Sequence, residues 1–231
     1  MNVITINGQI GTGGPEIGNE VARRLGYEYV DRLILAEAAQ RLGATVAVLR
    51  EKERRVPTAR ERIARFLQTV MERSAASGAM GDPYFGPGLA VLLGEEYPEL
   101  AKEPITSADQ VHDQRFIEVT QAVIKELASK LNVVINGRAS NLILKDLPDA
   151  FHVGLVSSGM DSRIKVIMTR EGVSAEEAAR MINEHEKARV TYFRKFFKAS
   201  PYDPTLYHIM IDAHRLGPNR VATAIISAAG H

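Results

Sequence analysis

The feature that most constrains this chain is a glycine-rich turn close to its amino-terminal end. The apolar run Val3–Ile6 precedes the turn, and the seven residues from Gly8 to Gly14 include four glycines. Apolar residues from Ile17 to Leu25 then recur at the spacing of one helical face. A strand, a glycine loop and a helix in this order surround a phosphate with backbone N–H groups and a helix amino terminus. The segment therefore predicts a phosphate-binding turn, and a tight turn that binds nothing is the alternative.

The loop matches neither of two standard phosphate-binding motifs in full. The motif G-x-x-x-x-G-K-[ST] needs a lysine and a hydroxyl residue where this chain has Gly14 and Pro15, although the spacing of Gly8 and Gly13 is kept. A dinucleotide-binding fingerprint fails because Glu16 stands where the third glycine belongs. Backbone amides can still hold a phosphate, but a cation for the transferring phosphate must then come from another part of the chain.

Composition excludes several other classes of protein. The 231 residues are 45% hydrophobic and 25% charged, which is typical of a globular domain. The net charge of +1 gives no general attraction to nucleic acid or to an anionic membrane. The absence of cysteine rules out disulfides and thiolate metal sites. No signal-peptide pattern or apolar run of about 20 residues is seen, so we expect a cytoplasmic protein without membrane or nucleic-acid partners.

Short apolar runs alternate with helical patterns, which predicts an α/β fold with a parallel sheet covered on both faces. The expected strands are Val3–Asn7, Tyr27–Val30, Val133–Asn136, His152–Leu155 and His208–Asp212. A helix is expected over residues 31–42, and a helical insertion lobe over residues 44–130, with a Gly/Pro-rich segment at 78–104. The charged run from Arg50 to Arg65 is interpreted as a solvated or subunit-interface helix, which leaves a homodimer open.

The second half of the chain contains a predicted lid region over residues 160–200. Ser174 and Glu177 form a capping-box pattern that predicts the start of a long helix. Arg163, Arg170 and Arg189 lie in this region and could close over a polyphosphate. A solvated helix face with ion pairs is the alternative reading of the same charges.

Two further candidates stand at the expected carboxyl ends of strands, where ligands bind in open parallel sheets. Asp31 follows the second expected strand, and it could orient a nucleotide hydroxyl or a metal-bound water, cap the next helix, or do both. Arg138 follows the third, where its guanidinium would face the same crevice as the glycine loop and could hold phosphate oxygens. A pairing of Arg138 with a surface carboxylate is the alternative.

Taken together, these segments resemble the cytidylate-kinase-like family, a branch of the nucleoside monophosphate kinases within the P-loop fold. The residues that carry the resemblance are Ile4-Thr5-Ile6, Gly11-Thr12-Gly13-Gly14, Ile17-Gly18, Leu25-Gly26, Asp31, Val134-Ile135, Gly137-Arg138-Ala139, Lys187-Ala188-Arg189, Tyr192 and Ile209-Met210-Ile211-Asp212. The likeness covers most of the chain outside residues 44–110.

The resemblance implies a P-loop NTPase-like three-layer fold with a five-stranded parallel sheet, an inserted helical lobe and lid helices. It implies ATP, together with Mg²⁺, at the glycine loop, on Gly8, Gly11, Thr12, Gly13 and Gly14. A nucleoside monophosphate, CMP or dCMP in the first place, would lie against Asp31 and Arg138, under a lid that carries Arg189. The implied reaction is transfer of the γ-phosphoryl group from ATP to that monophosphate.

The chain departs from the family at two positions. Gly14 replaces the loop lysine of the cytidylate kinases, and Ala139 replaces the aspartate of their Gly-Arg-Asp motif. Our working hypothesis is that Arg163, Arg170 and Arg189 supply the missing positive charge. One alternative is a nucleotide-binding regulatory protein with little or no kinase activity. Another is a kinase that acts on a different small phosphorylated or hydroxylated metabolite.

Overall fold

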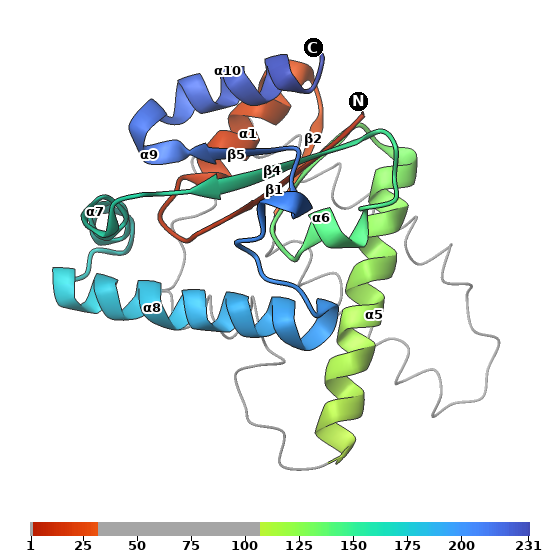
Figure 1. The fold of residues 1–231 in the computed structure, drawn as a ribbon, viewed down its shortest axis with the longest axis horizontal. Coiled ribbons are helices and arrows are strands. Elements are labelled where there is room, and N and C mark those ends of the chain that lie inside the picture. Colours follow the sequence, from red (N-terminus) through yellow and green to blue (C-terminus); the bar gives the residue numbers. More distant parts are fainter. Residues whose placement is uncertain (1, 32–106) are drawn as a thin grey trace.

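A five-stranded parallel sheet forms the centre of the structure, a computed structural model that describes residues 2–31 and 107–231 (Figure 1). The strand order is β2-β3-β1-β4-β5. The strands are β1 (Val3–Gly8), β2 (Glu28–Val30), β3 (Val133–Asn136), β4 (Ala150–Val156) and β5 (Ile209–Asp212). All five coincide with expected strands, with ends that differ by a few residues at most. The predicted fold class is confirmed.

The register of the sheet brings the glycine loop to the carboxyl edge of the three central strands. Ile6 in β1 pairs with Asn136 in β3 on one side and with Val153 in β4 on the other. Both β1 and β3 are buried almost throughout, as expected for parallel strands that are covered on both faces. The residues that follow β1 and β3 therefore emerge side by side.

Helices α1 (Gly14–Leu25) and α10 (Pro218–Ala228) cover one face of the sheet, and the short helix α9 (Ala213–Leu216) precedes α10 (Figure 1). Ile17 and Val21 of α1 pack with Val221 and Ile225 of α10 against the strands, and all four side chains are fully buried. The apolar spacing noted in the sequence after the glycine loop is the face of α1 that forms this core. The sequence pattern therefore fixes how α1 approaches the loop.

Helices α5 (Ser107–Lys130) and α6 (Ser140–Ile143) cover the other face. Val123, Ile124 and Leu127 of α5 pack against β3 in a second apolar cluster. Helix α5 carries the chain directly into β3, as the sequence predicts for residues 108–131.

Helices α7 (Met160–Glu171) and α8 (Ala175–Tyr192), here called the lid helices, follow β4 at its carboxyl end (Figure 1). Ser174 caps α8 as predicted, because its Oγ accepts a hydrogen bond from the backbone N–H of Glu177 at 3.2 Å. Arg163 and Arg170, which the sequence places in the predicted lid region, both lie in α7. Gly172, with φ at +68°, ends α7 in a left-handed conformation.

A π-helical turn (Phe193–Phe197) continues α8, and a short 3₁₀ turn (Pro204–Leu206) precedes β5. The helix expected over residues 31–42, the Gly/Pro-rich segment 78–104 and nearly all of the insertion lobe lie outside the described residues. No helix within residues 2–31 and 107–231 combines the length and the apolar character needed to cross a membrane.

Candidate functional site

The glycine loop (residues 8–14) has the backbone geometry of a tight turn that opens into a helix. Gly11 and Gly13 have φ values of +81° and +77°, a region that residues with a Cβ rarely adopt. Gly13 is the N-cap of α1, and no side chain caps that helix end. The first N–H groups of a helix have no partner within the helix, so they are available to an anion at this point.

Hydrogen bonds attach the loop to the end of β4. The backbone N–H of Gln9 donates to the carbonyl oxygen of Leu155 at 3.2 Å, and the side-chain carbonyl of Gln9 accepts from the N–H of Ser157 at 2.9 Å. The Thr12 hydroxyl donates to the carbonyl oxygen of Gln9 at 2.6 Å. These bonds fix the loop at the carboxyl edge of the sheet before any ligand is present.

Arg170 lies at the glycine loop. Together with Asn136 and residues 8–15, it lines a cavity of about 20 Å³. The Arg170 side chain is 12% exposed, and its Nε lies 3.1 Å from a carboxylate oxygen of Glu171. Its Nη2 is buried and has no hydrogen-bond partner among the described residues. Glu171 therefore binds one edge of this guanidinium, and the Nη2 group can donate a hydrogen bond to a ligand oxygen.

The size of the cavity sets a condition on ligand entry. A space of about 20 Å³ holds roughly one water molecule. A phosphate group is larger than this space, and outward movement of a lining side chain such as Arg170 would enlarge it. Lid segments that open to admit a ligand and then close over it are common in phosphoryl-transfer enzymes.

Gly14, at the position of the missing lysine, has space for a side chain. A Cβ built there would lie 3.5 Å from Oδ1 of Asn136 and 3.8 Å from Cδ1 of Leu155, which are ordinary contact distances. Its backbone also lies outside the left-handed region. Packing therefore does not require glycine at this position.

Arg163 and Arg189, the other two predicted lid arginines, meet at Glu186 in α8. Nη2 of Arg163 donates to one Glu186 oxygen at 3.2 Å, and Nε of Arg189 donates to the other at 2.7 Å. Arg163 also donates from Nε to the carbonyl oxygen of Ile10 at 2.8 Å. Both arginines are nearly buried. Arg163 therefore contacts the glycine loop directly, Arg189 reaches it only through Glu186, and the residues described as lining the loop cavity include Arg170 but neither of these two.

Asp31 and Arg138 emerge at the ends of neighbouring strands. Val30 in β2 pairs with Ile135 in β3, so the residues that follow each strand lie at one edge. Asp31 is 6% exposed and Arg138 is 1% exposed. The Arg138 guanidinium carbon lies 5.7 Å from the centre of the Tyr192 ring. Arg138 is not among the described lining residues of the glycine-loop cavity, and its guanidinium packs on Tyr192 near the end of α8.

The backbone at Arg138 is strained. Gly137, Arg138 and Ala139 have φ values of +91°, +57° and +52° in succession. A non-glycine residue in this region costs about 1–3 kcal/mol, and such residues cluster at functional sites. The strain turns the chain directly from β3 into α6 and directs the Arg138 side chain inward.

The described residues, 2–31 and 107–231, include no group of three or more histidine or acidic side chains that could hold a metal ion. Mg²⁺ commonly keeps several waters and binds mainly through substrate phosphates. Asn136 lines the glycine-loop cavity, where its side-chain oxygen could accept a hydrogen bond from such a water.

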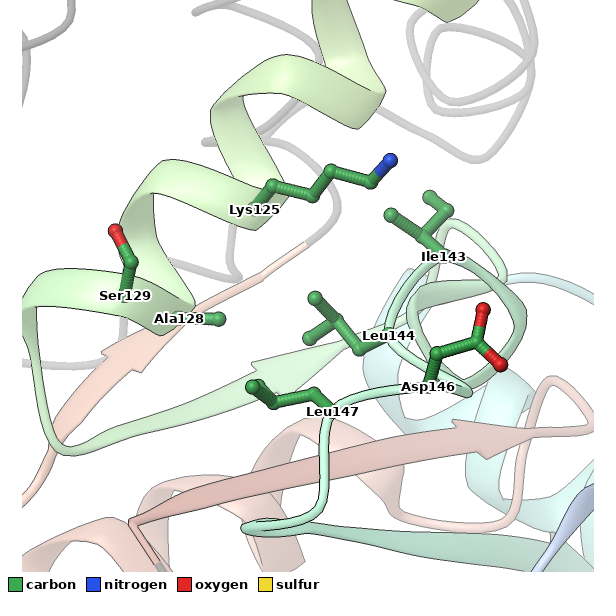
Figure 2. Close-up of a pocket in the computed structure, with 7 residues that line it drawn as sticks. All are labelled: Lys125, Ala128, Ser129, Ile143, Leu144, Asp146 and Leu147. Carbon is green, nitrogen blue, oxygen red and sulfur yellow. The ribbon is translucent and has the colours of Figure 1, made fainter.

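A second cavity, of about 270 Å³, lies between α5 and the segment that connects α6 to β4. Figure 2 shows Ala128, Leu144 and Leu147 pointing into this space, whereas the Asp146 carboxylate points away from it. Its lining residues precede β3 and β4, at the amino ends of the strands, so this cavity is separate from the glycine loop. We place the candidate active site at the loop, where the polar groups converge.

Sequence reasoning missed four residues of the site: Gln9, Asn136, Glu186 and Tyr202. Asn136 directly precedes the Gly-Arg pair, and Glu186 directly precedes the Lys-Ala-Arg segment, so both adjoin recognised motifs. Their positions could have been suspected on that ground. Tyr202 carries no comparable signal, because only the fold brings it beside Arg189, whose guanidinium carbon lies 5.1 Å from the ring centre.

Comparison with known proteins shows which family this chain belongs to. A cytidylate kinase from Thermococcus kodakarensis is 26% identical over 148 residues, which cover 61% of this chain and 74% of that protein. A cytidylate kinase from Thermoplasma volcanium is 20% identical over 97% of this chain and 89% of its own length. The solved structure of an uncharacterized protein from Eubacterium ventriosum shares the fold, with a TM-score of 0.63 at 17% identity, over 98% of this chain and 97% of that one. The model of the cytidylate kinase-like family matches residues 3–215, and the chain therefore belongs to that family.

Proposed function

We propose that this protein transfers the γ-phosphoryl group of ATP to a nucleoside monophosphate, with CMP and dCMP as the favoured acceptors. Membership of a kinase family supports phosphoryl transfer, and the relatives named cytidylate kinase support the choice of acceptor. The observation that carries the proposal is the position of Arg170, whose guanidinium lines the cavity formed by the glycine loop.

In this proposal the donor nucleotide lies at the glycine loop. Backbone N–H groups of Gly11–Gly14 bind its phosphates, and Arg170 takes the role of the absent lysine. Phosphoryl transfer depends mainly on positioning and on neutralising charge on the moving group. An arginine fork can bind two phosphate oxygens at once, which suits this role. When bound with the nucleotide, Mg²⁺ would add further positive charge, and the side-chain oxygen of Asn136 could hold one of its waters.

The acceptor lies at the ends of β2 and β3. Arg138 binds its phosphate and Asp31 binds a hydroxyl of its sugar. Both side chains are buried beside the strand that carries Asn136 toward the loop, so donor and acceptor share one edge of the sheet. Burial strengthens these charge interactions, because little water competes for them.

A second candidate function is nucleotide binding without turnover. The observation in its favour is the glycine at position 14, since the loop itself carries no cationic side chain. Removing one preorganised stabilising donor can reduce a rate by about 10²–10³-fold. A chain with such a loss would be a nucleotide-binding regulatory protein with little or no kinase activity. A kinase of another small metabolite is the remaining alternative.

The test is an acceptor screen. Purified protein is incubated with Mg-ATP and with each common nucleoside monophosphate in turn, and ADP and the diphosphate product are quantified. Product with CMP or dCMP above the other acceptors is the predicted result. Tight ATP binding without product from any acceptor would support the second candidate and contradict the first.

A further inference from the structure

A hydrogen-bonded cluster around Glu186 connects the two lid helices. Glu186 lies in α8, and its side chain is 15% exposed. One carboxylate oxygen accepts from Arg189 in the same helix, and the other accepts from Arg163 in α7. A single carboxylate therefore binds guanidinium groups from both helices.

Tyr202 extends the cluster toward the glycine loop. Its ring lies against the Arg189 guanidinium, whose carbon is 5.1 Å from the ring centre, and its hydroxyl interacts with the side chains of Glu186 and Gln9, which both affect its pKa. Burial, followed by the interaction with Glu186, raises the pKa of Tyr202, so the hydroxyl keeps its proton and can donate. Gln9 is the second residue of the glycine loop.

Arg163 provides a second connection to the loop. Its Nε donates to the carbonyl oxygen of Ile10 at 2.8 Å. The backbone of α7 also packs closely on the next residue, because a Cβ at Gly11 would lie only 3.0 Å from the Arg163 carbonyl oxygen. Ile10 is thus held by an arginine that also binds Glu186, and Gln9 interacts with Tyr202, whose ring packs on the other arginine bound to Glu186.

We propose that Glu186 is a positioning residue that fixes the glycine loop in its phosphate-binding shape and couples that shape to the two lid helices. The inference rests on the proposed function in one respect, namely that a nucleotide binds at this loop. A carboxylate suits the position because it binds two nearly buried guanidinium groups together. Members of such networks reinforce each other in a site that excludes water. Loss of the Glu186 carboxylate would loosen the glycine loop and the two lid helices together.

The substitution Glu186→Gln tests this role with little change in shape. The glutamine side chain would keep one acceptor oxygen but lose the negative charge and one of the two guanidinium bonds. Glu184→Gln is the matched control, because Glu184 lies two positions earlier in α8, is 48% exposed and pairs with Arg180. Tyr202→Phe is a second test variant that keeps the ring on Arg189 and removes only the hydroxyl.

The first measurement is backbone amide hydrogen exchange in the ligand-free proteins. Exchange at Gln9 and Thr12, whose N–H groups are hydrogen-bonded, is expected to rise by about tenfold in Glu186→Gln and by a smaller factor in Tyr202→Phe. Amides in the middle of β1 and β3 are expected to exchange as in the wild type. Glu184→Gln is expected to match the wild type everywhere.

The second measurement is Mg-ATP binding by calorimetry, with kcat and KM where turnover is found. Mg-ATP affinity is expected to fall by about tenfold in Glu186→Gln, with a rise in KM for ATP and an unchanged KM for the acceptor. A variant that merely loses stability would show none of this selectivity.

Each outcome decides the inference. If Glu186→Gln folds and its loop amides exchange at the wild-type rate, the inference is overturned, whatever the affinity for Mg-ATP. If Glu186→Gln does not fold, Tyr202→Phe takes its place, and wild-type exchange and affinity in that variant overturn the inference. If the wild type binds no Mg-ATP, the proposed function fails, while the exchange comparison still decides whether Glu186 holds the loop.

Discussion

Arg170 and Gly14 line the same cavity, so a guanidinium from α7 lies beside the position at which the glycine loop has no side chain. The positive charge at this site is carried by a helix that follows β4 rather than by the loop itself. Closure of the lid and neutralisation of the phosphate would then be a single event. In a kinase whose loop carries a lysine, by contrast, the charge is present before the lid closes.

The first prediction concerns two glycines in α1. Gly18→Ala would place a Cβ 2.8 Å from Cε2 of Tyr29, so the ring must shift, and overpacking of this kind costs about 1–3 kcal/mol. Gly14→Ala has room and is expected to change the free energy of unfolding by less than about 1 kcal/mol, since alanine favours a helix over glycine. Urea unfolding of both variants checks this. Equal destabilisation by the two would contradict the packing described around α1.

The second prediction concerns the acceptor site. Arg138→Lys keeps the charge but loses the planar fork, and lysine replaces arginine poorly where two oxygens are bound together. The KM for the monophosphate is expected to rise by about tenfold or more, which corresponds to about 1.4 kcal/mol, while the KM for Mg-ATP stays unchanged. Steady-state kinetics with each substrate varied in turn make the comparison. A rise confined to the KM for Mg-ATP would instead indicate that Arg138 binds the donor nucleotide.

The third prediction concerns pH and His152, a buried residue of β4. Oγ1 of Thr5 lies 2.8 Å from its Nδ1, and its ring stacks on His208. Burial, together with the charge of His208, lowers the pKa of His152 from 6.5 to about 4. Because the unfolded chain binds a proton that the folded protein rejects, stability should rise with pH between about 4 and 6.5.

The size of this effect follows from the same values. Between pH 7 and pH 5, His152 should remove about 2 kcal/mol of stability from the wild type. The comparison is urea unfolding at both pH values for the wild type and for His152→Gln, which has no titratable group at this position. The variant is expected to lose less stability on acidification. An identical loss in both proteins would show that His152 is not the group responsible.

The sequence was sufficient for the parts of the fold that depend on local pattern. Apolar runs such as Val133–Asn136 indicate strands because a parallel strand is buried on both faces. The cap at Ser174 was readable because the capping box needs residues only three positions apart. The sequence also indicated a pair of lid helices but did not give the bounds of α7, whose C-cap Gly172 lies two residues before Ser174.

The functional site was less predictable, because long-range packing places its side chains. Arg170 could be recognised as a cation of the lid region, but its position beside the loop depends on how α7 docks on Gly11. Glu186 resembles a solvated charge when α8 is considered alone. Its burial arises from Arg163 in another helix. Arg138 packs against Tyr192, a residue far along the chain.

The central claim is that Arg170 provides the cation for the glycine loop. The direct measurement is the Mg-ATP dissociation constant by calorimetry for the wild type, Arg170→Ala, the exposed control Arg180→Ala, and Arg170→Ala combined with Gly14→Lys. Loss of a charged hydrogen bond should weaken binding by about tenfold or more in Arg170→Ala, and the added lysine should restore part of the affinity. Arg180→Ala should bind as the wild type does. Wild-type affinity in Arg170→Ala would contradict the account.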